Sequence, residues 1–347
     1  MTGNRFSLNR RMLMRGTAAG LLAAPALVGK GLAAGAVTWR VQSHWPKASS
    51  SFTGSLVALA NEVARRTDGA FKLVLLGDGE FAKGADIYNI VRKGVVPMGT
   101  FSPSYVQDNA QAASFMYGIP GTLRESWEMQ HVVKNLGIED LVNEDLAAEG
   151  TMIFGEKVLP TELTLTRNVT SLADFQGLKI RSSGTMLDFL ALAGAAPQYV
   201  PGSELYQALS SGVVDGAHWG AAVGAQSMSL WEVCKYHVKP PIAQTTDAYI
   251  VNLDALNALD DQMRTAFIDA MESRFFRRSI EYVHAEAVAV SEGRRDDGLQ
   301  VIQLPDDVLA VMAEASKKVM ENEAAKGERA TKAADIYLGL MRDMGYI

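Results

Sequence analysis

Few residues in this sequence stand in spacings that support catalysis. Gly77-Asp78-Gly79 follows a predicted strand, as in a dinucleotide-binding loop, but the next glycine, Gly84, comes five residues after Gly79 rather than three. The five histidines form no His-x-x-x-His pair. No Gly-x-Ser-x-Gly nucleophile motif and no phosphate-binding Gly-x-x-x-x-Gly-Lys-Ser/Thr motif occurs. The sequence therefore favours a binding protein over an enzyme.

Composition narrows the class further. The chain has 347 residues, of which 48% are hydrophobic, a content typical of a globular protein of about two domains. The single cysteine, Cys234, excludes a disulfide framework and a cysteine-ligated zinc or iron–sulfur site, and we expect it in the core. The formal charge of −6 argues against a nucleic-acid binder that neutralises phosphates.

The first 36 residues are typical of an export signal. They hold five basic and no acidic side chains, with the adjacent pair Arg10 and Arg11 before an apolar, Ala/Gly-rich stretch that ends in Ala34-Gly35-Ala36. The paired arginines favour the twin-arginine route over the general one. The alternative is a membrane anchor, but the apolar stretch is interrupted by Pro25 and is shorter than the roughly 20 residues that span a bilayer. Removal of residues 1–36 would leave a chain of charge −11, which we expect in the periplasm.

The remaining sequence alternates between strand and helix patterns, which predicts an α/β fold with a largely parallel sheet. Predicted strands are 37–42, 71–76, 95–101, 151–155, 161–167, 178–181, 196–200, 213–219 and 248–252. Predicted helices are 53–67, 85–93, 125–136, 137–149, 184–193, 203–210, 222–234, 261–292, 305–323 and 328–344. The pattern indicates two α/β lobes followed by helices, with no Ser/Gly linker between the lobes.

One pair of segments carries a resemblance to a known family. Residues 171–181 read SLADFQGLKIR and residues 201–216 read PGSELYQALSSGVVDG. Their order and spacing resemble the signature of the solute receptors of tripartite ATP-independent periplasmic (TRAP) transporters. Weaker similarity extends over residues 37–347. Among these receptors, the chain is most similar to the subgroup that binds 2-oxo and 2-hydroxy monocarboxylates.

The resemblance implies a two-lobe periplasmic binding protein fold, type II-like, with an interlobe cleft, a long hinge-spanning helix and a helical C-terminus. On this basis we assign 37–160 plus about 248–285 to lobe I. Lobe II takes 161–247 plus part of the C-terminal helices, and 305–347 forms those helices.

Arg181 is the strongest candidate for ligand binding. In the family, the arginine that ends the Lys-x-Arg strand makes a two-point contact with a ligand carboxylate, and a guanidinium matches a carboxylate in geometry and charge. The structural alternative is a surface arginine paired with Asp174 or Asp188. A second family arginine, about twenty residues upstream, is replaced here by Thr161, so a monocarboxylate is favoured over a doubly charged ligand.

The residues at 218 and 219 bear on ligand class and on metal binding. Trp219 matches the monocarboxylate subgroup, whereas many other members have asparagine there. The preceding residue is typically a glutamate that helps to hold a cation, but here it is His218. Sodium or calcium beside the ligand is therefore an open question, since hard cations prefer oxygen ligands, and no other cofactor is expected. His218 could hydrogen-bond the ligand or simply form the cleft wall; His218 and Glu162 border the position where relatives hold the cation.

Most of the other candidates lie in loops that follow predicted strands: His44, Trp45, Phe81, Ser102 and Tyr105. Tyr117 lies in a crossover, and Glu162 just before the strand that leads to Lys179. Trp45, Tyr105, Tyr117 and Trp219 would form a wall suited to an acid with an apolar or ring-bearing tail, although each aromatic could instead serve ordinary packing. Glu162 would repel an anionic ligand unless a proton or cation intervened.

These features predict a periplasmic receptor that captures a small organic acid through Arg181, closes, and delivers it to TRAP membrane permease subunits. The C-terminal helices could pack on their own lobe or form a homodimer. Two alternatives remain: an exported cofactor-dependent oxidoreductase, and a carboxylate sensor for a signalling partner.

Overall fold

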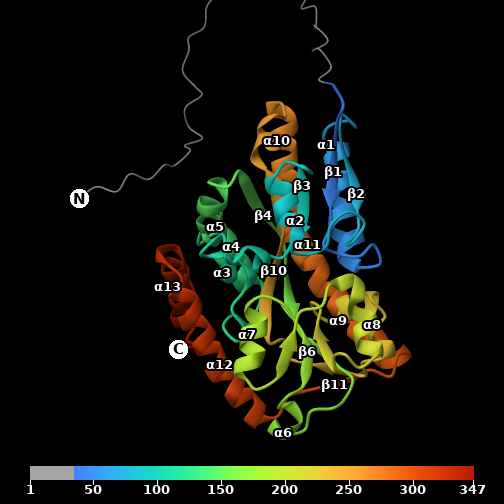
Figure 1. Ribbon diagram of the computed structural model, residues 1–347, viewed down its shortest axis with the longest axis vertical. Helices are drawn as coiled ribbons and strands as arrows, with labels where there is room; N and C mark the ends of the chain where they lie inside the picture. Colours follow the sequence, from blue (N-terminus) through green and yellow to red (C-terminus); the bar gives the residue numbers. More distant parts are fainter. Residues whose placement is uncertain (1–34) are drawn as a thin grey trace, which may run out of the picture. The chain divides into compact units, whose positions relative to one another are not determined.

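The structure is a computed structural model that describes residues 35–347 (Figure 1). The predicted export signal lies almost wholly outside the described residues. No helix within residues 35–347 is long and apolar enough to cross a membrane.

Two mixed sheets organise the fold, so the expectation of a largely parallel sheet is wrong. The first sheet has the order β2-β1-β3-β10-β4, and β10 runs antiparallel to both of its neighbours. The second has the order β11-β9-β5-β8-β6-β7, with β5 antiparallel to β8 and β9. The alternation of strand and helix that the sequence predicted is kept where strands pair in parallel. These pairs are β1–β2, β1–β3, β6–β7 and β6–β8.

The strands of the first sheet are β1 (Val37–Gln42), β2 (Phe71–Leu76), β3 (Met98–Phe101), β4 (Thr151–Thr161) and β10 (Ala243–Asn252). Those of the second are β5 (Leu163–Leu165), β6 (Lys179–Arg181), β7 (Ala196–Gln198), β8 (Gly216–His218), β9 (Tyr236–Val238) and β11 (Gln300–Ile302). The helices are α1 (Ala58–Arg66), α2 (Asp86–Arg92), α3 (Ala113–Tyr117), α4 (Ser126–Lys134), α5 (Ile138–Ala147), α6 (Leu172–Phe175), α7 (Thr185–Leu192), α8 (Leu205–Ser210), α9 (Ala222–Ser227), α10 (Leu253–Asn257), α11 (Asp261–Asp296), α12 (Asp306–Ala324) and α13 (Glu328–Asp343). A π-helical segment, Phe52–Val57, precedes α1.

Two elements differ in length from the sequence prediction. β4 continues through Glu156 and Lys157 to Thr161 and pairs with β10, whereas the sequence predicted a short strand at 151–155 and a separate one from 161. Neutralisation of Lys157 by its neighbours allows these charges inside the sheet. The helix predicted at 222–234 ends at Ser227, because Ser229 adopts a left-handed backbone conformation with φ of 55°.

The long helix α11 connects the two lobes. Near its middle, Arg274 donates a hydrogen bond of 2.7 Å to the carbonyl of Gly54 in the first lobe. Further along, the Glu286 carboxylate accepts a hydrogen bond of 2.7 Å from the backbone N–H of Ala222, at the start of α9 in the second lobe. Burial, with a smaller effect of the nearby Glu162 carboxylate, raises the pKa of Glu286 to about 8. One rigid helix therefore positions elements on both sides of the cavity described below.

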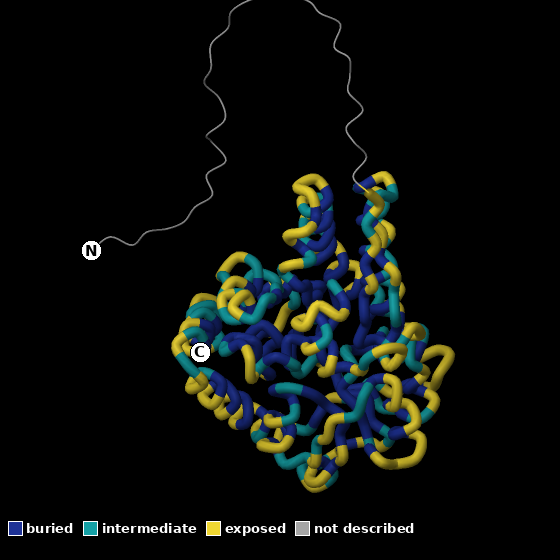
Figure 2. Tube along the Cα trace, turned by 45° about the horizontal axis from the view of Figure 1, so that its top comes forward, coloured by how far each residue is buried: buried dark blue, intermediate teal, exposed yellow. Residues whose placement is uncertain are grey.

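The C-terminal helices α12 and α13 lie along one side of the described chain (Figure 1). The buried face of α13 includes Ala333, Ala334 and Tyr337, and the Tyr337 hydroxyl donates a hydrogen bond of 2.6 Å to the Phe115 carbonyl. Buried positions run along the strands, while exposed residues lie on the outer helices and loops (Figure 2). Cys234 is fully buried, as predicted.

Candidate functional site

A cavity lies where the carboxyl ends of several strands from both sheets meet. Loops after β1 and β3 line it from the first lobe, and the ends of β6 and β8 line it from the second. This is the usual place of ligand sites in α/β folds. Its volume is about 60 Å³. Because one water needs about 10–15 Å³ of such space, the cavity accommodates about four to six water-sized groups.

The structure brings eight of the ten predicted ligand-binding residues to this cavity. They are Arg181, Trp219, His218, Tyr105, Trp45, His44, Ser102 and Tyr117. Further lining residues are Ser49, Ser51, Leu159, Ser183, Gly220, Gly224, Thr245, Asp247 and Tyr282. Contact of each of them with a ligand remains a prediction.

Arg181 is the last residue of β6 and lines the cavity, and only 3% of its surface is exposed to solvent. Its Nε donates to the carbonyl of Val200 at 2.9 Å and its Nη1 to the carbonyl of His218 at 2.8 Å. No carboxylate within residues 35–347 forms an ion pair with it, which rules out the pairing with Asp174 or Asp188. Burial lowers the pKa of Arg181, because a low-dielectric site disfavours the charged form. The guanidinium is thus held rigidly by two carbonyls while its charge has no anionic partner.

His218 lies at the end of β8 beside Arg181. Its Nδ1 is 3.1 Å from the Ser182 hydroxyl, and its Nε2 is 3.5 Å from the Tyr117 hydroxyl. Burial, reinforced by the positive charge of Arg181, lowers the pKa of His218 to about 3. The imidazole is therefore neutral at neutral pH and can serve as a hydrogen-bond partner, not as a second cation.

The Trp219 ring lies next to the Arg181 guanidinium and packs closely against Gly202. The Arg181 Cζ lies 4.8 Å from the centre of the Trp219 ring, within cation–π range. A Cβ at Gly202 would come within 2.2 Å of this ring, so the glycine of the 201–216 motif leaves room for the indole. The motif therefore has a local structural role in placing Trp219.

Two predicted site residues lie outside the cavity wall. Phe81 is on the loop after β2 and is 52% exposed, because this loop turns its phenyl ring to solvent. Glu162 is buried, but its carboxylate faces away: Oε2 is 2.5 Å from His237 Nε2, and Oε1 accepts a hydrogen bond of 2.6 Å from Lys239. Both of its oxygens are thus already engaged inside the second lobe.

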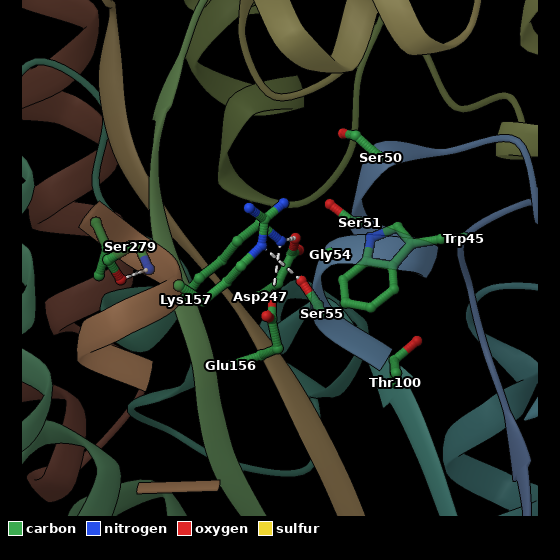
Figure 3. Close-up of polar contacts among 12 residues, drawn as sticks. Trp45, Ser50, Ser51, Gly54, Ser55, Thr100, Glu156, Lys157, Asp247 and Ser279 are labelled. Carbon is green, nitrogen blue, oxygen red and sulfur yellow. Dashed lines mark hydrogen bonds and ion pairs between the residues drawn. The ribbon is translucent and has the colours of Figure 1, made fainter. Parts of the chain in front are cut away.

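Sequence reasoning missed the only carboxylate that lines the cavity among the described residues, Asp247 on β10. Lys157 on β4 donates a hydrogen bond of 2.6 Å to Asp247 Oδ2 and one of 2.8 Å to Glu156 Oε2 (Figure 3). Lys157 is fully buried, and its Nζ lies 4.7 Å from the centre of the Trp45 ring. The signal in the sequence was the occurrence of acidic and basic residues inside strands that are otherwise apolar or β-branched.

The donor groups do not form an oxygen-rich cation site. No group of three or more His, Cys, Asp or Glu side chains within residues 35–347 is arranged to hold a metal ion. His218 offers nitrogen, the Glu162 oxygens are engaged, and Asp247 is paired with Lys157. A hard cation such as sodium or calcium prefers several oxygen ligands, so these side chains fit one poorly.

The two lobes also touch outside the cavity lining. Lys83 and Glu204 form an ion pair of 2.6 Å, and the backbone N–H of Ser203 donates to Asp78 Oδ2 at 3.2 Å. These contacts join the loop after β2 to the segment after β7. Contacts of this kind between the lobes are expected for a closed binding protein.

Comparison with known proteins agrees with this geometry. The family model described as bacterial extracellular solute-binding protein, family 7, matches residues 42–326. A monocarboxylate 2-oxoacid-binding periplasmic protein of Nostoc is 24% identical over 302 residues, covering 84% of this chain and 80% of the relative.

Solved structures of TRAP solute-binding proteins share the fold. One from Bordetella bronchiseptica, with calcium and picolinate, has a TM-score of 0.83 at 21% identity and covers 90% of this chain and 94% of its own. Another, from Pseudoalteromonas atlantica with sodium and pyruvate, has a TM-score of 0.80 at 20% identity, covering 89% and 98%. The predicted two-lobe α/β fold is thereby confirmed. The family matched over residues 42–326 is one of solute-binding proteins and not of enzymes, which excludes the oxidoreductase alternative. The chain belongs to bacterial extracellular solute-binding protein family 7.

Proposed function

We propose that this protein captures a small monocarboxylate of the 2-oxo or 2-hydroxy class between its lobes and delivers it to TRAP membrane permease subunits. The observation that carries the proposal is Arg181, a buried guanidinium that faces the cavity without an anionic partner in the described chain. A ligand carboxylate would neutralise this buried charge and accept a pair of hydrogen bonds from the guanidinium. The Nostoc relative, described as a monocarboxylate 2-oxoacid-binding protein, supports the ligand class.

The size of the cavity and the net charge of the protein limit the class of ligand further. A cavity of about 60 Å³ favours an acid of few heavy atoms over the larger ring-bearing tail that the aromatic wall had suggested. After removal of the leader, the chain would carry −11, so its overall field repels an anion. Selection of the acid must therefore be local, at Arg181 and its neighbours.

A cation beside the ligand is not required in this proposal. Sodium and calcium accompany the ligands of the two similar solved structures. In this chain, the side chains around the cavity fit such an ion poorly, and Lys157 already balances part of the charge of Asp247. Binding is accordingly expected to proceed in the presence of a chelator.

We also propose that residues 1–36 direct the chain to the periplasm by the twin-arginine route. Replacement of both Arg10 and Arg11 by lysine should block export while the full-length chain accumulates in the cytoplasm, since this route reads the arginine pair. Cell fractionation and immunoblotting would measure this. Unchanged export of the double variant would point to the general route instead.

A homodimer through α12 and α13 stays a prediction, because α13 already buries an apolar face against its own chain.

The ligand is tested by calorimetric titration of the protein without its leader against small 2-oxo, 2-hydroxy and aromatic carboxylates, each with and without EDTA. We expect saturable 1:1 binding of at least one small monocarboxylate and none of the matching amides, which lack the anionic group. Absence of binding by every acid would contradict the proposal. A genome without neighbouring TRAP permease genes would favour the signalling alternative.

A further inference from the structure

Asp247 lies in the cavity wall next to an irregularity in the sheet. Asp247 pairs with Lys157 and Ala248 with Gly155, so Glu156 on β4 is the extra residue of a bulge opposite Asp247. Bulges are common beside functional sites. The Asp247 side chain keeps 16% of its surface exposed, and it lines the same cavity as Arg181.

The two oxygens of Asp247 have different surroundings. Oδ2 accepts the hydrogen bond from Lys157 at 2.6 Å. Oδ1 accepts none within hydrogen-bond distance from residues 35–347, and His44 Nε2 is 3.8 Å away. Oδ1 is therefore free to accept a hydrogen bond from a ligand at the edge of the cavity, where the Asp247 side chain keeps part of its surface exposed.

Lys157 makes this carboxylate compatible with an anionic ligand. Its buried ammonium group lies between Glu156 and Asp247, and it balances part of their charge (Figure 3). Although burial alone would raise the pKa of Asp247, the charge and hydrogen bond of Lys157, with His44, outweigh burial and hold this pKa below its ordinary value. Asp247 is thus ionised at neutral pH and can only accept hydrogen bonds.

We propose that Asp247 Oδ1 accepts a hydrogen bond from an O–H or N–H group on the carbon next to the ligand carboxylate. This inference rests on the proposed function and refines its substrate class. The small cavity leaves no room for a long spacer between the carboxylate held by Arg181 and the donor facing Asp247. A 2-hydroxy acid supplies such a donor, whereas a 2-oxo acid presents a second acceptor to an acceptor. The receptor therefore prefers 2-hydroxy acids over 2-oxo acids of the same skeleton.

The test is calorimetric titration with two matched pairs, lactate with pyruvate and 2-hydroxybutyrate with 2-oxobutyrate, in EDTA and in calcium or sodium. We expect the wild type to bind the preferred enantiomer of each hydroxy acid about tenfold or more tightly than the oxo acid, in EDTA as in either salt. In Asp247→Asn, Lys157 requires an acceptor, so the amide oxygen should face Lys157 and the amide N–H₂ the cavity. The variant should then prefer the oxo acids.

Three outcomes separate this inference from the proposed function. If no carboxylate binds the wild type, the proposed function fails. If acids bind but the wild type and Asp247→Asn show the same ratio within each pair, only the role of Asp247 is overturned. A third result would be that oxo acids bind more tightly than hydroxy acids, but only when calcium or sodium is present. If Asp247→Asn then removes this dependence on the cation, Asp247 is a cation ligand and the inference is also overturned. As a control, Asp254→Asn, on α10 away from the cavity, should leave every ratio unchanged.

Discussion

Replacement of Arg181 by methionine is expected to weaken binding of every carboxylate by about 100-fold or more. Removal of one partner from a buried, hydrogen-bonded charge pair costs about 2–5 kcal/mol, and about 1.4 kcal/mol corresponds to a tenfold change in affinity. The buried guanidinium has no carboxylate partner within residues 35–347, so no internal anion competes with the ligand or replaces it. Calorimetric titration with the tightest acid found for the wild type measures the loss.

The variant Arg181→Lys separates charge from geometry. It keeps the positive charge but cannot bind a carboxylate through two parallel N–H groups, so we expect an intermediate loss of about tenfold. Because Arg181 also donates to the carbonyls of Val200 and His218, the unliganded variants must be checked for folding by circular dichroism and thermal unfolding. Wild-type affinity in a folded Arg181→Met would show that another group anchors the acid.

Replacement of Lys157 by methionine is expected to lower the free energy of unfolding by about 3–5 kcal/mol. The lysine is fully buried and bonds to both Glu156 and Asp247, so its loss leaves carboxylates in the interior without a compensating charge. Methionine keeps most of the volume of the lysine but loses the contact of its ammonium group with the Trp45 ring, so the loss reflects charge more than volume. Urea denaturation of wild type and variant at neutral pH measures the difference.

A surface lysine provides the matched control for this experiment. Lys332 pairs with Glu328 at 2.8 Å on α13 but is 56% exposed, so Lys332→Met should cost less than about 0.5 kcal/mol. The double variant Lys157→Met/Asp247→Asn should recover part of the loss, because one of the two uncompensated charges is gone. A loss below about 1 kcal/mol for Lys157→Met would mean that solvent reaches the pair.

The sequence was sufficient to predict residues that lie at the ends of strands. Arg181, His218 and Trp219 follow or end short strands with clear patterns, and a strand end has one natural place in such a fold, at the rim where ligands bind. Their motif spacing also matches that of the family. Of the eight predicted cavity residues, all but Tyr117, at the end of α3, share this position or lie in the segments that follow these strands.

The residues that could not be predicted depend on pairing between distant segments. The surroundings of Asp247 follow from the pairing of β10 with β4 and from Lys157, which lies 90 residues earlier. Glu162 had a plausible position in the sequence, but its orientation is set by His237 and Lys239, from another part of the second lobe. Phe81 shows the same limit, since the direction in which a loop turns a side chain is not encoded by its distance from a strand.

The place of β10 between β3 and β4 determines when the first lobe can fold. This interior strand follows β5 to β9 in the chain, so the ribosome makes most of the second sheet before the first sheet can close. Co-translational folding of the first lobe on its own is thereby prevented, and contacts of such long sequence separation form slowly. A twin-arginine exporter, which carries folded proteins, would place this slow step in the cytoplasm, whereas the general route would leave it to the periplasm.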